Sequence, residues 1–114
     1  MKEDKIKIGA EAENQAAEYL VSKGFEIKAR NYRHKKSEID LIIQKDDWLI
    51  FVEVRKRTNL AFGYPEESIS ANKRNKIMEG ANHYLEETQW QGNVRYDIIA
   101  IDGKEIVHFE DAFY

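Results

Sequence analysis

Two acidic side chains interrupt hydrophobic segments, where a carboxylate needs a specific reason to be present. Asp40 lies within the apolar run 39–43, and Glu53 lies within the run 49–54. Burying a carboxylate costs free energy unless a cation, a proton or hydrogen bonds compensate for its charge. These two positions are therefore the first candidates for chemistry.

The segments that carry these two acids are predicted to form a hairpin. Strands 38–44 and 48–56 flank a short turn around residues 46–47. If the hairpin is symmetric about that turn, Asp40 lies directly opposite Glu53. Opposed side chains have Cβ atoms about 5 Å apart, and like charges at that distance repel. Such a pair calls for a bound cation or a shared proton.

Oxygen ligands of this kind select hard cations, Mg²⁺ first and Mn²⁺ next. In the second strand, the alternation of side chains places Glu53, Arg55 and Arg57 on one face. A metal ion beside a cationic side chain is suited to phosphodiester hydrolysis, in which Arg55 would stabilise negative charge on the phosphate. The alternative is structural, namely that Glu53 only forms an ion pair with Arg55 or Arg57.

Further candidates lie on two predicted helices and in a basic segment. Glu13 lies on the first helix and could point toward the same site, although helix carboxylates are usually solvated. Lys73 lies at the start of the second helix, where a basic side chain opposes the helix dipole and suggests a phosphate contact. The residues predicted to contact nucleic acid are Arg33, Lys35, Lys36, Arg57 and Lys73.

The elements that must position these residues follow the order α-β-β-β-α-β-β. Apolar spacing predicts helices, and alternation and turn residues predict strands. Besides the hairpin, we expect a helix over 4–23, a strand over 25–30 with Phe25, Ile27 and Ala29 facing the core, a basic loop over 31–37, a loop over 59–67, a helix from Ser70, its predicted N-cap, to Glu87, and a hairpin of 94–101 with 105–109. This order predicts an α/β fold with a mixed, mostly antiparallel sheet flanked by helices.

Composition narrows the classes of protein to be considered. The chain has 114 residues, 42% hydrophobic and 34% charged, and no cysteine. These values predict one domain over residues 1–114 and exclude disulfides and thiolate zinc sites. The longest aliphatic and aromatic run, 48–52, has five residues, so neither a membrane span nor a secretory signal is expected and the predicted location is cytoplasmic.

Charge is distributed unevenly along the chain. The net charge is −3, but residues 28–76 carry 12 Lys and Arg against 7 Asp and Glu, and the other residues carry 6 against 14. A basic segment on an acidic protein can form a phosphate-binding face. The alternative is an ordinary solvated surface.

Several sequence blocks together resemble a known family. The segments 38–42 and 51–57, followed by Phe62-Gly63 and Pro65, are similar to those of the YraN-like family of predicted endonucleases. That family looks like the archaeal Holliday junction resolvases, within the PD-(D/E)XK or restriction-endonuclease-like superfamily. The resemblance covers nearly the whole chain and also includes Gly9, Glu13, Ala16, Tyr19, Leu20, Gly24, Asn31-Tyr32-Arg33, Lys73 and Arg95-Tyr96-Asp97.

The resemblance implies a restriction-endonuclease-like core and Mg²⁺-dependent cleavage of DNA, including branched DNA. Asp40 and Glu53 would bind the metal, Arg55 would occupy the position of the superfamily's lysine, and Glu13 would be an auxiliary acid. Arginine keeps its charge but does not readily release a proton, so a role in orientation is retained and one in proton transfer is lost. A junction-cleaving enzyme needs two sites, which leaves a homodimer open.

Two other function classes remain open at this stage. One is a non-catalytic nucleic-acid-binding module that keeps the nuclease fold and the basic face. The other is a protein-interaction domain that uses its acidic surface, especially residues 79–114.

Overall fold

The computed structural model describes the backbone of residues 2–56 and 69–113, and the side chains of residues 10–56 and 69–113. Arg57 and the segment 59–67, expected to be a loop, lie outside the described residues. The described elements are α1 (Lys2–Ser22), β1 (Glu26–His34), β2 (Ser37–Lys45), β3 (Trp48–Lys56), α2 (Ala71–Thr88), β4 (Asn93–Asp102) and β5 (Glu105–Phe109). This is the predicted order of elements.

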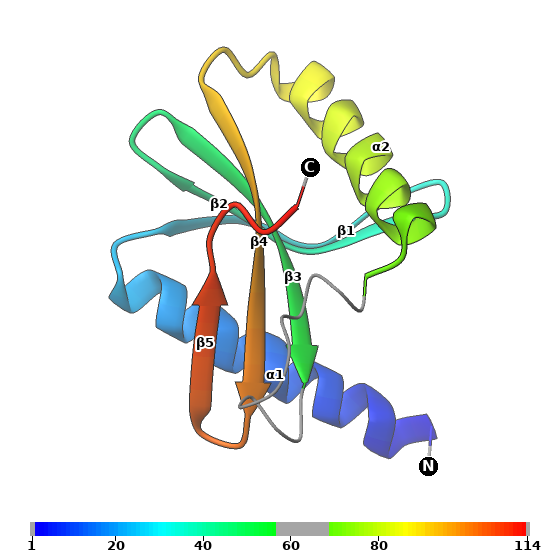
Figure 1. Ribbon diagram of the computed structural model, residues 1–114, viewed down its shortest axis with the longest axis vertical. Coiled ribbons are helices and arrows are strands. Elements are labelled where there is room, and N and C mark those ends of the chain that lie inside the picture. Colours follow the sequence, from blue (N-terminus) through cyan, green and yellow to red (C-terminus); the bar gives the residue numbers. More distant parts are fainter. Residues whose placement is uncertain (1, 57–68, 114) are drawn as a thin grey trace.

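The five described strands form one mixed sheet in the order β1-β2-β3-β4-β5 (Figure 1). β3 and β4 are parallel, with α2 between them in the chain, and the other neighbouring strands are antiparallel. The predicted α/β class and the mixed, mostly antiparallel sheet are therefore confirmed. Neither described helix combines the length and apolar character that a transmembrane span requires.

One face of the sheet is covered by α1. Ala12, Ala16 and Leu20 are buried on this helix and pack with Leu41 of β2 and Ile50 of β3. The small alanine side chains let the helix axis approach the strands closely, and close packing of this kind gains dispersion energy along with apolar burial. The spacing of these residues in the sequence predicted this helix correctly.

The other face of the sheet is covered by α2, where Ile77 and Ala81 pack with Phe51 of β3 and Ile98 of β4. The predicted N-cap is confirmed, because the Ser70 side chain accepts a hydrogen bond from the Lys73 N–H at 3.1 Å. This contact fixes where the helix begins, and therefore where its first-turn side chains start.

α2 approaches β2 closely at Gly80. A Cβ atom at this position would lie 2.9 Å from the Cβ of Ser37 on β2. We expect Gly80→Ala to lower the free energy of unfolding by about 1–2 kcal/mol, because overpacking outweighs the gain in helix propensity. Urea denaturation measures this. The control is Asn75→Ala, at an exposed position of the same helix, which should be neutral or stabilising.

The structure corrects two expectations for the first strand. The basic segment 31–37 is not a loop, because β1 continues to His34, which pairs with Ser37 across a two-residue turn. Contacts of Tyr32 with α2 stabilise this extension, which local polarity does not reveal. A register shift between Ile27 and Ala29 also separates their side chains, so that Ile27 packs with the α1 cluster and Ala29 with the α2 cluster.

Candidate functional site

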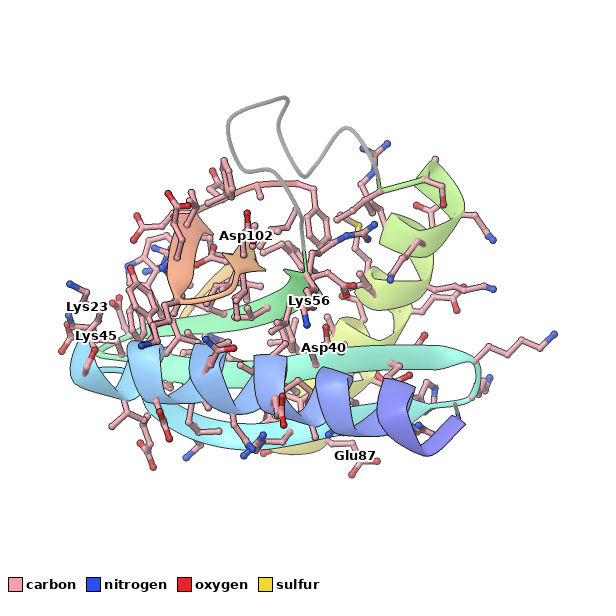
Figure 2. All side chains as sticks on the ribbon, turned by 90° about the horizontal axis from the view of Figure 1, so that it is seen from below. Lys23, Asp40, Lys45, Lys56, Glu87 and Asp102 are labelled. Carbon is pink, nitrogen blue, oxygen red and sulfur yellow. The ribbon has the colours of Figure 1, made fainter. Side chains whose placement is uncertain are left out.

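The site begins where β2 and β3 stop pairing. The predicted hairpin register is confirmed from Lys45–Trp48 to Leu41–Val52, but the pairing ends there, so Asp40 and Glu53 are not the directly opposed pair that was expected. Beyond the Leu41–Val52 pair the Asp40 side chain, rather than the β2 backbone, bonds to β3: its Oδ2 accepts a hydrogen bond from the Val54 N–H at 2.8 Å. Figure 2 shows Asp40 above the β2 ribbon, close to the end of β3 that Lys56 marks. The side chain thereby connects the two strands.

Glu53 follows the alternation of β3 and lies on the same face as Phe51, toward α2. It is buried, with 7% of its surface exposed. Its Oε1 lies 2.8 Å from the Nζ of Lys73 and 3.9 Å from the Nη1 of Arg55. The ion pair with Arg55 expected in the structural alternative is thus present, and the shorter one involves Lys73.

The local field disfavours a negative charge on Asp40. Burial, the nearby Glu53 carboxylate and the more remote Glu13 raise the pKa of Asp40 to about 7, although the Val54 N–H and Lys73 act in the opposite direction. At neutral pH the charged and the protonated forms of this aspartate are therefore both populated. Glu53 is paired with Lys73 and Arg55, whereas Asp40 has no ion pair among the described residues.

Glu13 reaches the same region from α1, on the other side of the sheet. Its Oε1 is buried and has no hydrogen-bond partner among the described residues. It is also close enough to raise the pKa of Asp40. Glu13 therefore lies within electrostatic range of Asp40, although it is not among the residues that line the pocket between β2, β3 and α2.

Asp40 and Glu53 open into a pocket of about 320 Å³ between β2, β3 and the start of α2. Its other lining residues are Lys36, Glu38, Ser70, Asn72, Lys73, Lys76 and Ile77. Sequence reasoning missed Lys76 as part of the site. The signal was present, because Lys76 follows Lys73 by three residues and so lies on the same side of the helix.

The residues predicted to contact nucleic acid do not share one environment. Arg33, Lys35 and Lys36 are exposed at the β1–β2 turn, and Lys36 lines the pocket. Arg33 also lies 3.4 Å from the carboxylate of Glu38. Lys73 forms an ion pair with Glu53, so its charge is balanced by a carboxylate of the protein itself.

Another buried acid has a different environment and serves as a comparison. Asp97 on β4 is fully buried and accepts hydrogen bonds from Arg95, from His108 and from the Asp111 N–H. Burial alone would raise the pKa of Asp97, but these hydrogen bonds outweigh it and hold the pKa below its usual value. The ion pair with Arg95, at 2.8 Å, is part of this network, and this acid is fully satisfied within the protein.

The donor set at Asp40 and Glu53 fits a hard divalent cation. The two carboxylates repel each other, Asp40 has no ion pair among the described residues, and Glu13 adds a buried oxygen without a hydrogen-bond partner there. Over residues 10–56 and 69–113 no group of three or more His, Asp or Glu side chains is placed to enclose a metal ion. Mg²⁺ does not require such a group, because it is usually held by one or two carboxylates and completes its shell with water and substrate oxygens.

These features define an α/β protein with a paired-carboxylate pocket between its sheet and its second helix. A family model described as "Uncharacterised protein family UPF0102" matches residues 12–101, so the chain belongs to this family. This is the YraN-like family that the sequence motifs indicated.

Curated relatives cover almost the whole chain. A UPF0102 protein of a Sulfurihydrogenibium species is 41% identical over 111 residues, which is 96% of each chain. Another, from Thermodesulfovibrio yellowstonii, is 36% identical over 110 residues, 96% of this chain and 98% of the relative. One from Clostridioides difficile is 43% identical over 104 residues, 89% of this chain and 91% of the relative.

Proposed function

We propose that this protein is a metal-dependent endonuclease that cleaves DNA, with a restriction-endonuclease-like core. The observation that carries the proposal is the pair of Asp40 and Glu53, two interacting and largely buried carboxylates beside Lys73 and Arg55. A carboxylate that only stabilised the fold would have its charged form favoured, as at Asp97, whereas the charged form of Asp40 is disfavoured. Two interacting carboxylates in a pocket lined with lysines are what a cation-dependent phosphodiesterase requires.

Each residue of the pocket has a separate role in this proposal. Asp40 and Glu53 hold Mg²⁺ or Mn²⁺, which supplies the Lewis acidity that activates water and stabilises charge on the phosphate. Arg55 remains charged at any working pH, so it orients the phosphate and stabilises its developing charge. Lys36 and Lys76 on the rim attract the phosphate backbone of DNA. Glu13, on α1, raises the pKa of Asp40 and so makes its charged form less favourable in the absence of a cation.

Cleavage of a panel of substrates tests this function. The panel contains linear duplex, flapped, four-way branched and single-stranded DNA, each incubated with Mg²⁺, Mn²⁺ or EDTA. We expect cleavage with either metal and none with EDTA. An identically purified Asp40→Asn sample identifies contaminating nuclease. Preference for the four-way substrate would support a homodimer with two sites, which sedimentation would then measure.

Binding to DNA should depend strongly on salt and on the exposed turn. Replacing both Lys35 and Lys36 by Gln is expected to weaken DNA binding about uniformly across sequences and to reduce the slope of log affinity against log salt by about 1–2. Fluorescence anisotropy in EDTA at several salt concentrations measures this slope. Lys104→Gln, at an exposed position of the β4–β5 turn, is the matched control. An unchanged slope in the double variant would place the DNA contact elsewhere.

A second candidate function is a nucleic-acid-binding module without catalysis. It is favoured by one observation, the presence of Arg55 where the related nucleases have a lysine, because arginine does not transfer a proton readily. In that case the protein binds DNA in EDTA and cleaves no substrate with any metal. Arg55→Lys would then be the variant to test for restored cleavage.

A further inference from the structure

We propose that Lys73 is an internal counter-ion of Glu53 which a divalent cation displaces, and that the displaced ammonium group then contacts a substrate phosphate. This inference rests on the proposed function, since it concerns the same pocket. It adds a residue that exchanges partners when metal binds. The argument depends on the fixed position of Glu53 and the mobility available to a lysine side chain.

The two members of the ion pair differ in how tightly they are held. The Glu53 side chain is 8% exposed, whereas the Lys73 side chain is 47% exposed. The backbone of Lys73 is fixed at the helix start by its hydrogen bond to Ser70. Four rotatable carbons separate that backbone from the ammonium group, so the charge can move while the helix remains in place.

The placement of Lys73 in α2 needs an explanation of its own. Basic side chains in the first turn of a helix oppose the positive end of its dipole, and α2 has no acidic residue in that turn. The ion pair with Glu53, at 2.8 Å, accounts for a lysine at this position in the metal-free protein. Lys76 also lines the pocket and has no ion pair within the described parts of the chain. It is therefore a natural comparison.

A divalent cation cannot share Glu53 with Lys73 without cost. Both would approach the same carboxylate, and their positive charges would repel each other in a partly buried site. Lys73 must therefore give up its contact, and the nearest positions for its ammonium group lie in the same pocket. A phosphate group that enters the pocket would form an ion pair with the displaced ammonium group of Lys73.

Isothermal titration with Mn²⁺ tests the displacement without relying on cleavage. We expect Lys73→Met to bind Mn²⁺ about fivefold more tightly than the unmodified protein, because no ion pair has to be broken. Lys76→Met, one turn further along the same helix, should change the affinity by less than about twofold. An equal change in both variants, or none in Lys73→Met, would overturn the proposal. If the unmodified protein binds no Mn²⁺ at all, the proposed metal-dependent function fails as well.

Thermal denaturation supplies a second readout. In EDTA, Lys73→Met should melt at a lower temperature than the unmodified protein because it leaves Glu53 without its closest cation. Saturating Mn²⁺ should then raise its melting temperature by more than it raises that of the unmodified protein. Lys73→Gln gives the same comparison if the Met variant does not fold. An equal Mn²⁺ effect on all these proteins contradicts displacement.

The phosphate contact has its own test. Binding of a fluorescein-labelled DNA duplex is measured in EDTA and in Ca²⁺, which prefers the same oxygen ligands. We expect Ca²⁺ to increase the affinity of the unmodified protein for DNA by a larger factor than it increases that of Lys73→Met. An equal increase in both would show that the released lysine does not contact the backbone.

Discussion

Asp40→Asn and Glu53→Gln are each expected to lower the rate of metal-dependent DNA cleavage by at least about 100-fold. Each substitution removes the negative charge that holds the cation, while it keeps the shape of the side chain. The two acids lie at the point where β2 and β3 stop pairing and both line the pocket, so each substitution removes a charge from the site itself. Single-turnover cleavage of linear duplex DNA measures the loss.

The same Asp40→Asn substitution is expected to stabilise the metal-free protein. The pKa of Asp40 is about 7 in the folded state and about 4 in an unfolded chain. Ionisation therefore favours the unfolded state, and the protein loses stability as pH rises from about 4 to about 7. Asparagine does not ionise and can still accept the Val54 hydrogen bond. At pH 8 in EDTA we expect a gain of roughly 1–3 kcal/mol in the free energy of unfolding.

The control for both measurements is Glu38→Gln. Glu38 lines the same pocket but is exposed and lies 3.4 Å from Arg33. This variant should keep its cleavage rate within a few-fold of the unmodified protein and its stability within about 0.5 kcal/mol. Equal activity in all samples would indicate contamination. Loss of activity together with loss of stability in Asp40→Asn would mean that Asp40 supports the fold rather than binding a cation.

The order of elements and the pairing of β2 with β3 could be predicted from the sequence. The apolar run 49–54 defines one strand, and the turn at Asp46 fixes the register of its partner. The N-cap at Ser70 was readable for the same reason, since local hydrogen bonding determines it. Such features depend on residues that are close in the chain.

What could not be predicted depends on contacts between distant parts of the chain. The extension of β1 to His34 relies on Tyr32 reaching α2, where its hydroxyl lies 2.6 Å from the Nδ1 of His83. The change of face at Ala29 follows from a register shift that leaves no mark on hydrophobic periodicity. The local sequence of β1 therefore gives no indication of its extension or of its register shift.

The candidate site also contains one feature that local sequence predicts and one that depends on distant contacts. The hairpin register alone placed Asp40 near Glu53, so this part was predictable. The role of Lys73 was not, because its partner is 20 residues away in the chain and on a different element. A lysine that opposes the helix dipole was the available signal, and it indicated a negative partner without distinguishing a phosphate from a buried carboxylate.

Asp97→Asn is expected to cost about 3–5 kcal/mol in the free energy of unfolding at pH 7. Asp97 is fully buried and receives hydrogen bonds from Arg95 on the same strand, His108 on β5 and the Asp111 N–H after β5. Asparagine cannot balance the charge of Arg95, which is largely buried as well. A loss of this size is a large fraction of the total stability of a small protein, typically about 5–15 kcal/mol. Chemical denaturation with urea measures it.

The pH dependence separates charge pairing from simple packing. The pKa of Asp97 is depressed in the folded state, so its ionisation stabilises the protein above about pH 4, and this contribution is lost as pH falls through the folded-state pKa. The difference in stability between Asp97→Asn and the unmodified protein should therefore narrow in acid. A gap that stays constant with pH would attribute the cost to packing instead. Asp102→Asn, on the same strand and half-exposed, should change stability by less than about 0.5 kcal/mol.

Aspartate-to-asparagine substitution at two buried sites of one protein should thus give opposite signs near neutral pH. At Asp97 every nearby donor favours the charged form, so removing the charge destabilises the fold. At Asp40 burial, and then two other carboxylates, disfavour the charged form, so removing the charge stabilises the metal-free fold. A structural carboxylate is selected for the first behaviour, whereas a site kept for a cation retains the second at a cost in stability. Losses of stability at both positions would contradict the assignment of Asp40 to a metal site and leave the two aspartates with the same structural role.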